Sequence, residues 1–342
     1  MFWHDILQLM LLTLGYIDSC ADIAYALLRA KIPIITPKPN PAPVSDADWS
    51  FPDTEAGIVA AVAAGATHLW ANTVVFAEHP LQTSRALDNA GVFIVGQPPK
   101  VVEAVDDKNR VNEALRAAGM RMVKGGIVTR GEDLGTCLER LGIKEWPVIG
   151  KPVRGRGSQG VKLCNSITTL AEHTRMLLEQ SAEVIVEEHL GGEEGTVTVL
   201  PIANEASPQH MDYSALPIVI RSSHVNGIMP YSNDVPVTAN SRVVTTEEMA
   251  RDPSYQAAMA ECERAAAFVH ATAPMRIDVR RKRDGAAFAM FDVNMKPVST
   301  MTIDRQTDTV LKLTTHMYTH THTHTHRIRQ ARDDQAESSS WR

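Results

Sequence analysis

The residues best suited to chemistry lie in one stretch, from Arg276 to Asn294, where two carboxylates and an amide flank an Asp-Gly pair. An Asp-Gly pair between apolar-rich runs predicts a β-hairpin, because glycine tolerates the positive φ of tight strand reversals. A three-residue turn centred on Gly285 would place Asp278 opposite Asp292, with Asn294 on the same face. Facing carboxylates destabilise a sheet unless a hard cation such as Mg²⁺ lies between them, so the stretch indicates a metal site.

The register of this hairpin is open on the sequence alone. A two-residue turn would move Asp278 away from Asp292, because a slip of one residue sends a side chain to the other face. The hairpin would then be a solvated, charged one with no metal between its strands. The candidates elsewhere in the chain favour the metal site.

A glycine-rich segment lies between a predicted buried strand at 146–152 and a second predicted strand at 161–164. Its spacing, G-x-G-x-x-G, is typical of a dinucleotide site only where a helix follows, and here a strand follows. The G-K-[ST] of a P-loop and the H-R-D and D-F-G of a protein kinase are missing. A glycine loop between strands can fold over a triphosphate, while a surface hairpin without ligand is the alternative. The loop residues concerned are Gly155, Gly157, Ser158 and Gly160.

Two lysines and an acidic turn complete the candidates. Lys108 lies in the first turn of a predicted helix, where a cation opposes the helix dipole, so we expect it to reach a phosphate. The alternative is an exposed lysine neutralised by Asp106 and Asp107. Lys151 lies near the end of the buried strand, and the strand that begins at Val184 ends in acids that could accept from an adenine amine or ribose hydroxyls.

Composition excludes several classes of protein. The 342 residues suffice for about two domains of ordinary size. A formal charge of -6 and 5% aromatic residues argue against nucleic-acid binding. No apolar run reaches the ~18 residues of a membrane span, and the start of the chain lacks the basic residues of a signal peptide. The cysteines are scattered without paired spacing, as is typical of reduced thiols in a cytoplasmic protein.

The elements that must position these residues begin with an α/β unit. Helical and strand patterns alternate over residues 1–100, with helices at 21–28, 53–64 and 81–89 and strands at 32–36, 67–71 and 92–95. This order predicts parallel strands with helical crossovers, of flavodoxin-like or Rossmann-like type. The first strand is open, because residues 2–14 read equally as helix or strand.

The second half of the chain has a less regular pattern. Residues 203–252 are polar and predict a long loop region with one strand at 218–220. An apolar stripe from Tyr255 to Val269 predicts a core helix. After Asn294 a Thr-His repeat and a polar tail predict a disordered C-terminus.

These segments, in this order, resemble the ATP-grasp superfamily from about Gly15 to Thr300, and its D-alanine:D-alanine ligase-like branch in particular. The stretch from Trp70 to Gln82 is similar to uncharacterised fungal ATP-grasp proteins. The resemblance implies a fold of mixed α/β and α+β class in four segments. They are a parallel α/β pre-ATP-grasp domain at 1–100, a small lobe with a lid at 101–200, a C-terminal lobe at 201–302 and a low-complexity tail at 303–342.

The resemblance also implies a role for each candidate. Lys108 and Lys151 would contact the ATP phosphates, and the glycine loop would close over them. Arg276 would stabilise the acyl-phosphate transition state, with Lys151 and Ser158 as the other catalytic groups. Glu187 would face the adenine and Glu194 the ribose hydroxyls. The remaining implied nucleotide contacts are Glu188 and Leu190, and the implied ligands of two Mg²⁺ ions, with Mn²⁺ as the alternative, are Asp278, Asp292 and Asn294.

The implied reaction is ATP-dependent ligation of a carboxylate to an amine through an acyl phosphate, with amino acids as substrates. No nucleic-acid or membrane partner is expected, and a homodimer is the expected assembly. Three departures from the family pattern matter: Gly150 replaces a β-branched residue, Asp292 replaces glutamate, and the chain after Asn294 differs, with Val298 in place of a small residue. They keep open a non-catalytic nucleotide-binding relic, and, more remotely, a structural scaffold without nucleotide.

Overall fold

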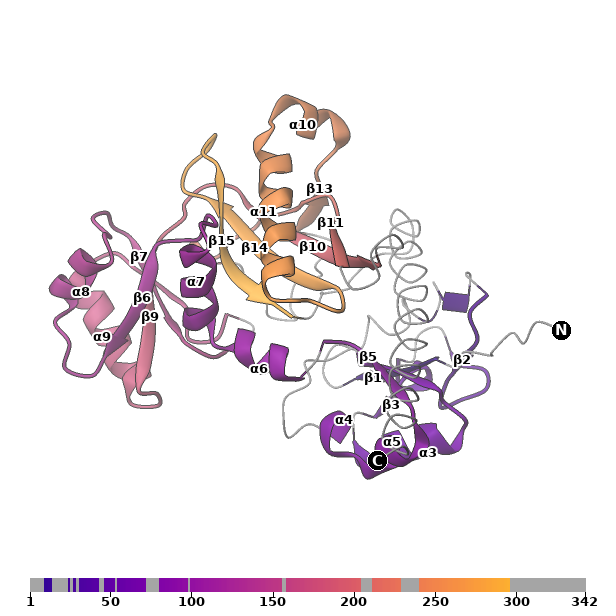
Figure 1. Ribbon diagram of the computed structural model, residues 1–342. Helices are drawn as coiled ribbons and strands as arrows, with labels where there is room; N and C mark the ends of the chain where they lie inside the picture. The colour runs from indigo at the N-terminus through magenta and orange to yellow at the C-terminus, as the bar shows by residue number, and fades with distance from the viewer. Residues whose placement is uncertain are drawn as a thin grey trace, which may run out of the picture.

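The computed structural model describes residues 9–13, 24, 27–28, 31–42, 46–52, 54–71, 80–97, 99–155, 158–203, 211–228 and 240–295. These residues form three sheets, one in the N-terminal part of the chain and two in the part that carries the candidate site residues (Figure 1). Gly157, Val298, the cysteine at 20 and the predicted tail at 303–342 lie outside the described residues.

The N-terminal sheet is parallel throughout and runs in the order β2-β1-β4-β5, with β3 also paired to β1. The parallel α/β prediction is therefore confirmed, and the open segment at 2–14 contains a strand. The predicted helix at 81–89 is instead two helices, because Ser84 is extended and its hydroxyl donates to Glu55 Oε1 at 3.0 Å. The elements are β1 (Leu9–Thr13), β2 (Ile34–Ile35), α2 (Asp46–Trp49), β3 (Phe51–Pro52), α3 (Glu55–Ala63), β4 (His68–Ala71), α4 (Pro80–Thr83), α5 (Arg85–Ala90) and β5 (Phe93–Val95).

The second sheet is antiparallel, in the order β6-β9-β7-β8, and two helices pack on it. The glycine loop joins β7 to β8, which confirms the predicted order of strand, loop and strand. Ser166 begins the following helix with a capping box, as its position before an amphipathic run predicts. The elements are β6 (Gly125–Thr129), α8 (Leu134–Arg140), β7 (Val148–Pro152), β8 (Lys162–Cys164), α9 (Ile167–Leu178) and β9 (Glu183–Glu188).

The third sheet is also antiparallel, in the order β13-β12-β10-β14-β15, and β11 pairs with the later part of β10 on the edge opposite β14. Its apolar face packs against α11, and against α6 and α7 at β15, which gives the largest core of the described residues (Figure 1). The elements are α6 (Pro99–Asp106), α7 (Lys108–Ala117), β10 (Glu194–Ala203), β11 (Met211–Ala215), β12 (Val219–Arg221), β13 (Ser241–Val243), α10 (Thr246–Arg251), α11 (Ser254–Phe268), β14 (Met275–Arg281) and β15 (Phe288–Asn294).

The prediction of a long loop at 203–252 is wrong for most of its described residues. They form β11, β13 and α10, whereas the strand predicted at 218–220 is confirmed as β12. The residues of β11, Met-Asp-Tyr-Ser-Ala, alternate apolar and polar side chains, and the prediction overlooked this period of two, which is typical of a strand. The sequence analysis also missed α6, which begins at a proline, a residue favoured in the first helical position. β10 begins at Glu194, so the predicted boundary at 200 falls within a strand of the third sheet.

The predicted hairpin is present, and Asp278 faces Asp292 as predicted, but the turn and the strand register differ from the prediction. Residues 282–287 join β14 to β15, a longer connection than the predicted three-residue turn, and Arg281 pairs with Phe288. That register alone would not place Asp278 opposite Asp292. A bulge at Phe291 shifts the pairing by one residue and restores the facing arrangement.

Gly150 in β7 has no room for a side chain. A Cβ there would lie 2.9 Å from Cδ2 of His173, whose Nε2 lies 3.2 Å from the Gly150 carbonyl and 2.9 Å from the Gly160 carbonyl. We expect Gly150→Val to lower the free energy of unfolding by about 1–3 kcal/mol through overpacking, measured by urea denaturation. Adding His173→Ala should recover at least half of the loss; an unchanged midpoint in the single variant would contradict this packing.

Candidate active site

The centre of the candidate site is the face of β14 and β15 that carries Asp278, Asp292 and Asn294. The Asn294 amide nitrogen lies 3.4 Å from Asp278 Oδ2 and 3.3 Å from Asp292 Oδ2. Thr196, opposite Asp278 on β10, donates its hydroxyl to Asp278 Oδ1 at 2.8 Å, and Arg276 Nη2 lies 3.1 Å from the other oxygen, Oδ2. Two carboxylates and an amide therefore converge on one face of the sheet, where Asp278 is buried and Asp292 and Asn294 are half-buried.

Two lysines from other elements reach this cluster. Lys108, in the first turn of α7, forms an ion pair with Asp292. Lys151, in β7, donates to the carbonyl of Phe291 at 3.1 Å, and this is the residue that the bulge leaves without a partner on β14. The bulge thus has two consequences, since it sets the position of Asp292 and presents a carbonyl to a lysine. In Figure 1, α7 lies between the second sheet and β15.

The alternative for Lys108, neutralisation by its two preceding acids, is wrong. Asp107 caps α7 by accepting from the backbone N–H of Arg110 at 3.0 Å, and Asp106 lies 3.9 Å from Arg154. The partner of Lys108 is Asp292, which is 184 positions away in the sequence.

The charges in the cluster shift its carboxyl groups in opposite directions. Burial raises the pKa of Asp278, although Arg276 opposes this. Burial acts on Asp292 in the same sense, but Lys108 and Lys151 outweigh it and hold its pKa at about 2. Burial also raises the pKa of Glu187, which Lys151 opposes at 2.7 Å. Cations and carboxylates alternate here, so each buried charge has a partner of opposite sign.

The donor set fits Mg²⁺ bound together with a ligand's oxygens. Carboxylate and amide oxygens are the ligands of hard cations, and a half-turn of the Asn294 amide would present its oxygen. Among the residues that the structure describes, no group of three or more His, Cys, Asp or Glu side chains has a metal-holding arrangement. Mg²⁺ is usually held by one or two carboxylates plus substrate phosphates, which is the kind of site that Asp278 and Asp292 can form.

The glycine loop lies beside Lys151, between β7 and β8. Ser158 and Gly160 both have positive φ, 57° and 72°, and a Cβ on Gly160 would lie 2.8 Å from Pro152 Cγ. The loop therefore turns back tightly over the strand that carries Lys151. Gly155 is described at its start.

The acidic residues predicted to read the nucleoside lie in two different parts of the site. Glu187 lies in the lysine cluster, where Asn112 Nδ2 also donates to its Oε1 at 3.3 Å. Glu188 accepts from the backbone N–H of Lys124 at 3.1 Å, and Leu190 is buried. Glu194 lies at the start of β10, where His224 and Arg280 contact it.

The sequence analysis missed four residues of this region: Asn112, Thr196, His224 and Arg280. Thr196 could be identified only once the pairing of β10 with β14 is known, because that register places it opposite Asp278. His224 is a single histidine in a polar segment and carries no sequence signal.

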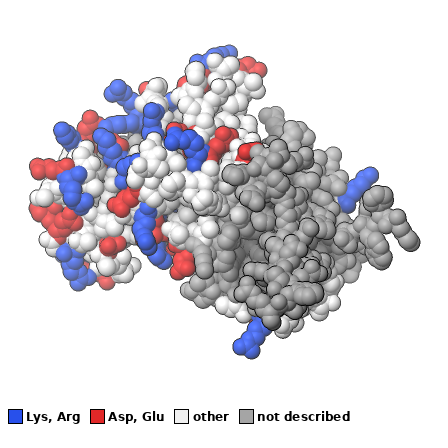
Figure 2. Space-filling view, in the orientation of Figure 1, with Lys and Arg blue, Asp and Glu red and all other residues white. Residues whose placement is uncertain are grey.

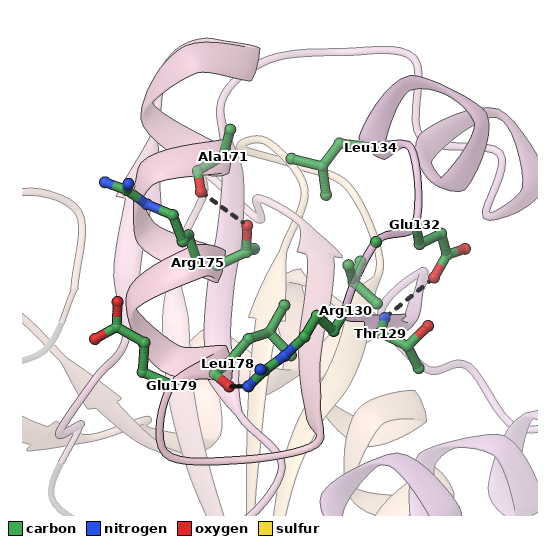
Figure 3. Close-up of a pocket in the computed structure, with 11 residues that line it drawn as sticks. Thr129, Arg130, Glu132, Leu134, Ala171, Arg175, Leu178 and Glu179 are labelled. Carbon is green, nitrogen blue, oxygen red and sulfur yellow. Dashed lines mark hydrogen bonds between the residues drawn. The ribbon is translucent and has the colours of Figure 1, made fainter.

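A separate pocket of ≈ 380 Å³ lies on the second sheet's lobe, between α9 and the segment that joins β6 to α8 (Figure 3). None of the candidate site residues lines it. Two of its charged side chains already have partners: Arg130 donates to the Leu178 carbonyl at 2.5 Å, and Glu132 accepts from the Thr129 N–H at 3.1 Å. The pocket is therefore distinct from the β14–β15 cluster.

The surface of the described residues carries mixed charge. In Figure 2, Lys and Arg side chains are interspersed with Asp and Glu on the described part of the visible face, without a continuous basic stripe. Three cysteines, Cys137, Cys164 and Cys262, are buried free thiols. None of the helices in the described ranges has the length and apolar character needed to span a membrane.

Comparison with known proteins gives one family match and many similar folds. The model of the family described as "D-ala D-ala ligase C-terminus" matches residues 115–303, more than half of the chain. An uncharacterised protein of Sinorhizobium fredii is 32% identical over 103 residues, 28% of this chain and 21% of that protein. The carbamoyl phosphate synthase large chain of Gemmatimonas aurantiaca is 26% identical over 104 residues, 30% of this chain and 9% of that protein. The chain thus matches about a fifth or less of the length of these curated relatives.

The solved structures align over nearly the whole chain. The D-alanine-D-alanine ligase of Coxiella burnetii has a TM-score of 0.63 at 13% identity and covers 95% of this chain and 99% of its own. The D-Ala:D-Ser ligase of Enterococcus faecalis has a TM-score of 0.62 at 14% identity, covering 91% and 99%. The biotin carboxylase domain of Hydrogenobacter thermophilus 2-oxoglutarate carboxylase, solved with MgADP and bicarbonate, has a TM-score of 0.62 at 14% identity, covering 91% and 70%. At these identities the likeness is one of fold.

Proposed function

The chain belongs to the D-Ala D-Ala ligase C-terminus family and has the predicted ATP-grasp fold, and from this premise we propose that it is an ATP- and magnesium-dependent carboxylate–amine ligase. The observation that carries the proposal is the meeting of Lys108 and Lys151 with Asp292. These residues come from a helix, a strand of the second sheet and a strand of the third, and their charged groups meet in one cluster.

The cluster is suited to a magnesium triphosphate because its charges can be exchanged for those of the ligand. Magnesium held by Asp278, Asp292 and Asn294 would neutralise charge on the phosphate oxygens during transfer. Lys108 now neutralises Asp292, and Lys151 neutralises Glu187. A cation at the carboxylates would leave Lys108 free to bind a phosphate oxygen, so the two ligands would bind cooperatively.

The reaction proposed needs no nucleophilic protein side chain. A substrate carboxylate oxygen attacks the γ-phosphorus of ATP, which breaks the bond to the β-phosphate oxygen and yields an acyl phosphate and ADP. An amine then attacks the acyl carbon, loses a proton and expels phosphate, which forms the amide. Arg276, paired with Asp278 at the same cluster, would stabilise the oxyanion and phosphate charge that develop in both steps.

The remaining candidates surround this centre. We assign the glycine loop, with Gly155, Gly157, Ser158 and Gly160, to the cover of the phosphates, where Ser158 would donate its hydroxyl. Glu187, which is paired with Lys151, would face the adenine from the boundary with the phosphates, and Glu188, Leu190 and Glu194 are assigned to the nucleoside end. Glu194 fits this place best, since its carboxylate lies on the same sheet face as Thr196 and the metal cluster, two residues away along β10.

Several finer assignments stay proposals. They are amino acids as substrates, Mn²⁺ as a substitute for Mg²⁺, a homodimer, a cytoplasmic location, the four-part division of the chain and the similarity to fungal ATP-grasp proteins. The pocket for the carboxylate and the amine would lie between the N-terminal domain and the third sheet, as the resemblance to the ATP-grasp family implies.

Amino-acid-dependent release of ADP tests the proposed activity. Full-length protein is incubated with ATP, MgCl₂ and single amino acids or pairs of them, and ADP is measured by a coupled assay. We expect ADP release that requires both Mg²⁺ and particular amino acids. Tight binding of MgATP without amino-acid-dependent ADP would instead support the alternative, a nucleotide-binding protein without catalysis, and no binding of MgATP would contradict both.

A further inference from the structure

Among the residues that the structure describes, Glu194 is contacted at one carboxylate oxygen only. Two side chains contact the same carboxylate oxygen, Oε2: His224 Nε2 at 2.8 Å and Arg280 Nη1 at 3.2 Å. Its side chain is 6% exposed, and no described residue donates to the other oxygen, Oε1. A carboxylate fixed in this way is an oriented acceptor with one oxygen left for a ligand's donor.

The segment that carries His224 is built into a fixed conformation. Ser223, the preceding residue, has a φ of 67°, which is unfavourable for a residue with a side chain and is concentrated at functional sites. Asn226 and Gly227 have φ of 50° and 78°, and Val225 and Ile228 exchange backbone hydrogen bonds of 2.9 and 3.0 Å. These values describe a tight two-residue turn with both central residues left-handed.

Arg280 ties this turn to Glu194. Its Nη1, which contacts Glu194, also donates to the Gly227 carbonyl at 2.9 Å, and its Nε donates to the Gly192 carbonyl at 3.1 Å. Arg280 lies directly opposite Glu194 in the β10–β14 register. The carboxylate, the arginine and the turn that supplies His224 therefore form one preorganised unit.

A further polar atom at this end has no partner. His189 Nε2 is buried and makes no hydrogen bond, and a Cβ on Gly227 would lie 3.5 Å from it. Buried polar atoms are nearly always satisfied, so an unsatisfied one beside the turn indicates a place where a ligand completes the hydrogen bonding.

We propose that His224 is a positioning residue that, with Arg280, holds Glu194 as a one-sided acceptor for the vicinal hydroxyls of a ribose, so that the site selects ribonucleotides over nucleotides lacking those hydroxyls. The inference rests on the proposed function, since it takes a nucleoside triphosphate as the ligand. His224 acts through Glu194: its Nε2–H donates to the carboxylate, and both the neutral Nε2–H tautomer and the imidazolium supply that proton.

The selectivity for the ribose has a physical cause. A ribose hydroxyl would donate to Oε1 while His224 and Arg280 hold Oε2, and a ligand without hydroxyls would leave a buried carboxylate oxygen unpaired. Hydrogen bonds to a charged partner of this kind change affinity by about 10- to 100-fold. If His224 is replaced, Glu194 loses one of its two fixed contacts and the acceptor is no longer oriented.

The test compares two ligands on the full-length protein. The dissociation constants of MgATP and of its 2′,3′-dideoxy analogue are measured by calorimetry for wild type, His224→Phe and His224→Gln. We expect wild type to prefer ATP by about 10-fold or more, His224→Phe to reduce that ratio to about 3 or less, and His224→Gln, which keeps a donor, to recover most of it.

The affinity ratio separates a positioning role from a merely structural one. A structural role would weaken both ligands alike and leave the ratio unchanged, and this outcome would overturn the inference, as would a wild type that binds both ligands equally. Thermal melting of each variant shows whether it is folded, and Glu194→Gln, which removes the acceptor itself, should abolish the preference with His224 in place. Failure of wild type to bind MgATP at all would remove the proposed function and this inference together, whereas binding without discrimination would remove only the inference.

Discussion

Replacing Lys151 with alanine is expected to weaken binding of MgATP by about 100-fold or more, because the variant loses the ammonium that would contact the phosphates. The variant is also expected to lose about 3–5 kcal/mol of unfolding free energy, since Glu187 stays buried without its partner at 2.7 Å. Calorimetry gives the affinity, and urea denaturation gives the stability.

Acidity should relieve the loss of stability in Lys151→Ala. Burial raises the pKa of Glu187 in the folded protein, so the folded state binds the proton more tightly than the unfolded state. Stability carried by a raised carboxyl pKa falls as pH rises, so without Lys151 the deficit should shrink as the pH is lowered and Glu187 is protonated.

A double variant separates the structural effect of Lys151 from its role in binding. Lys151→Met with Glu187→Gln removes both buried charges, and we expect it to recover most of the unfolding free energy while nucleotide affinity stays low. If the double variant also recovers wild-type affinity for MgATP, then Lys151 serves only to neutralise Glu187, and the proposed phosphate contact is wrong.

Replacing Asp292 with asparagine is expected to reduce amino-acid-dependent ADP release by about 10²- to 10³-fold. The pKa of about 2 keeps Asp292 ionised at working pH, so the substitution removes a full charge from the proposed metal site. Asparagine has the same shape, and the variant should stay folded. Titration with MgCl₂ should show that the variant needs a higher Mg²⁺ concentration for half-maximal rate.

Glu145→Gln provides the matched control for Asp292→Asn. It makes the same chemical change at an exposed carboxylate, 75% accessible, whose partner is Lys282 at 3.0 Å. Exposed pairs contribute little, so the rate and the Mg²⁺ dependence should stay within about twofold of wild type. Equal effects of the two substitutions, or full activity in Asp292→Asn, would contradict a metal site at Asp278 and Asp292.

The fold was predictable where apolar periodicity is strong. The parallel N-terminal sheet follows from alternating helical and strand patterns, the helix at 254–268 from its apolar stripe, and the hairpin from its Asp-Gly pair. β11 carries an alternation of apolar and polar residues that the prediction overlooked, whereas the three residues of β13, Ser-Arg-Val, are too few to show one, and pairing with β12 sets their conformation. The bulge at Phe291 was also not predictable. The pairing of β14 with β15 differs by one residue on its two sides, and no local sequence pattern indicates where that shift occurs.

The members of the candidate site were predictable as residue types, and their contacts only in part. Asp278, Asp292 and Asn294 share one face, as predicted, although the bulge at Phe291, which was not predicted, is needed to bring Asp278 opposite Asp292. No local pattern could join Lys108 to a carboxylate 184 positions away, and the family resemblance supplied that link. The residues that hold Glu194 were not predictable, because only the folded structure brings His224 and Arg280 into contact with its carboxylate.

A crystal structure of the full-length protein with MgCl₂ and a non-hydrolysable ATP analogue tests the central claim most directly. The account predicts the triphosphate between the ammonium groups of Lys108 and Lys151, with magnesium bound by Asp278, Asp292 and Asn294. A nucleotide bound elsewhere, for example in the pocket beside α9, with the Lys108–Asp292 and Lys151–Glu187 pairs intact, would contradict it.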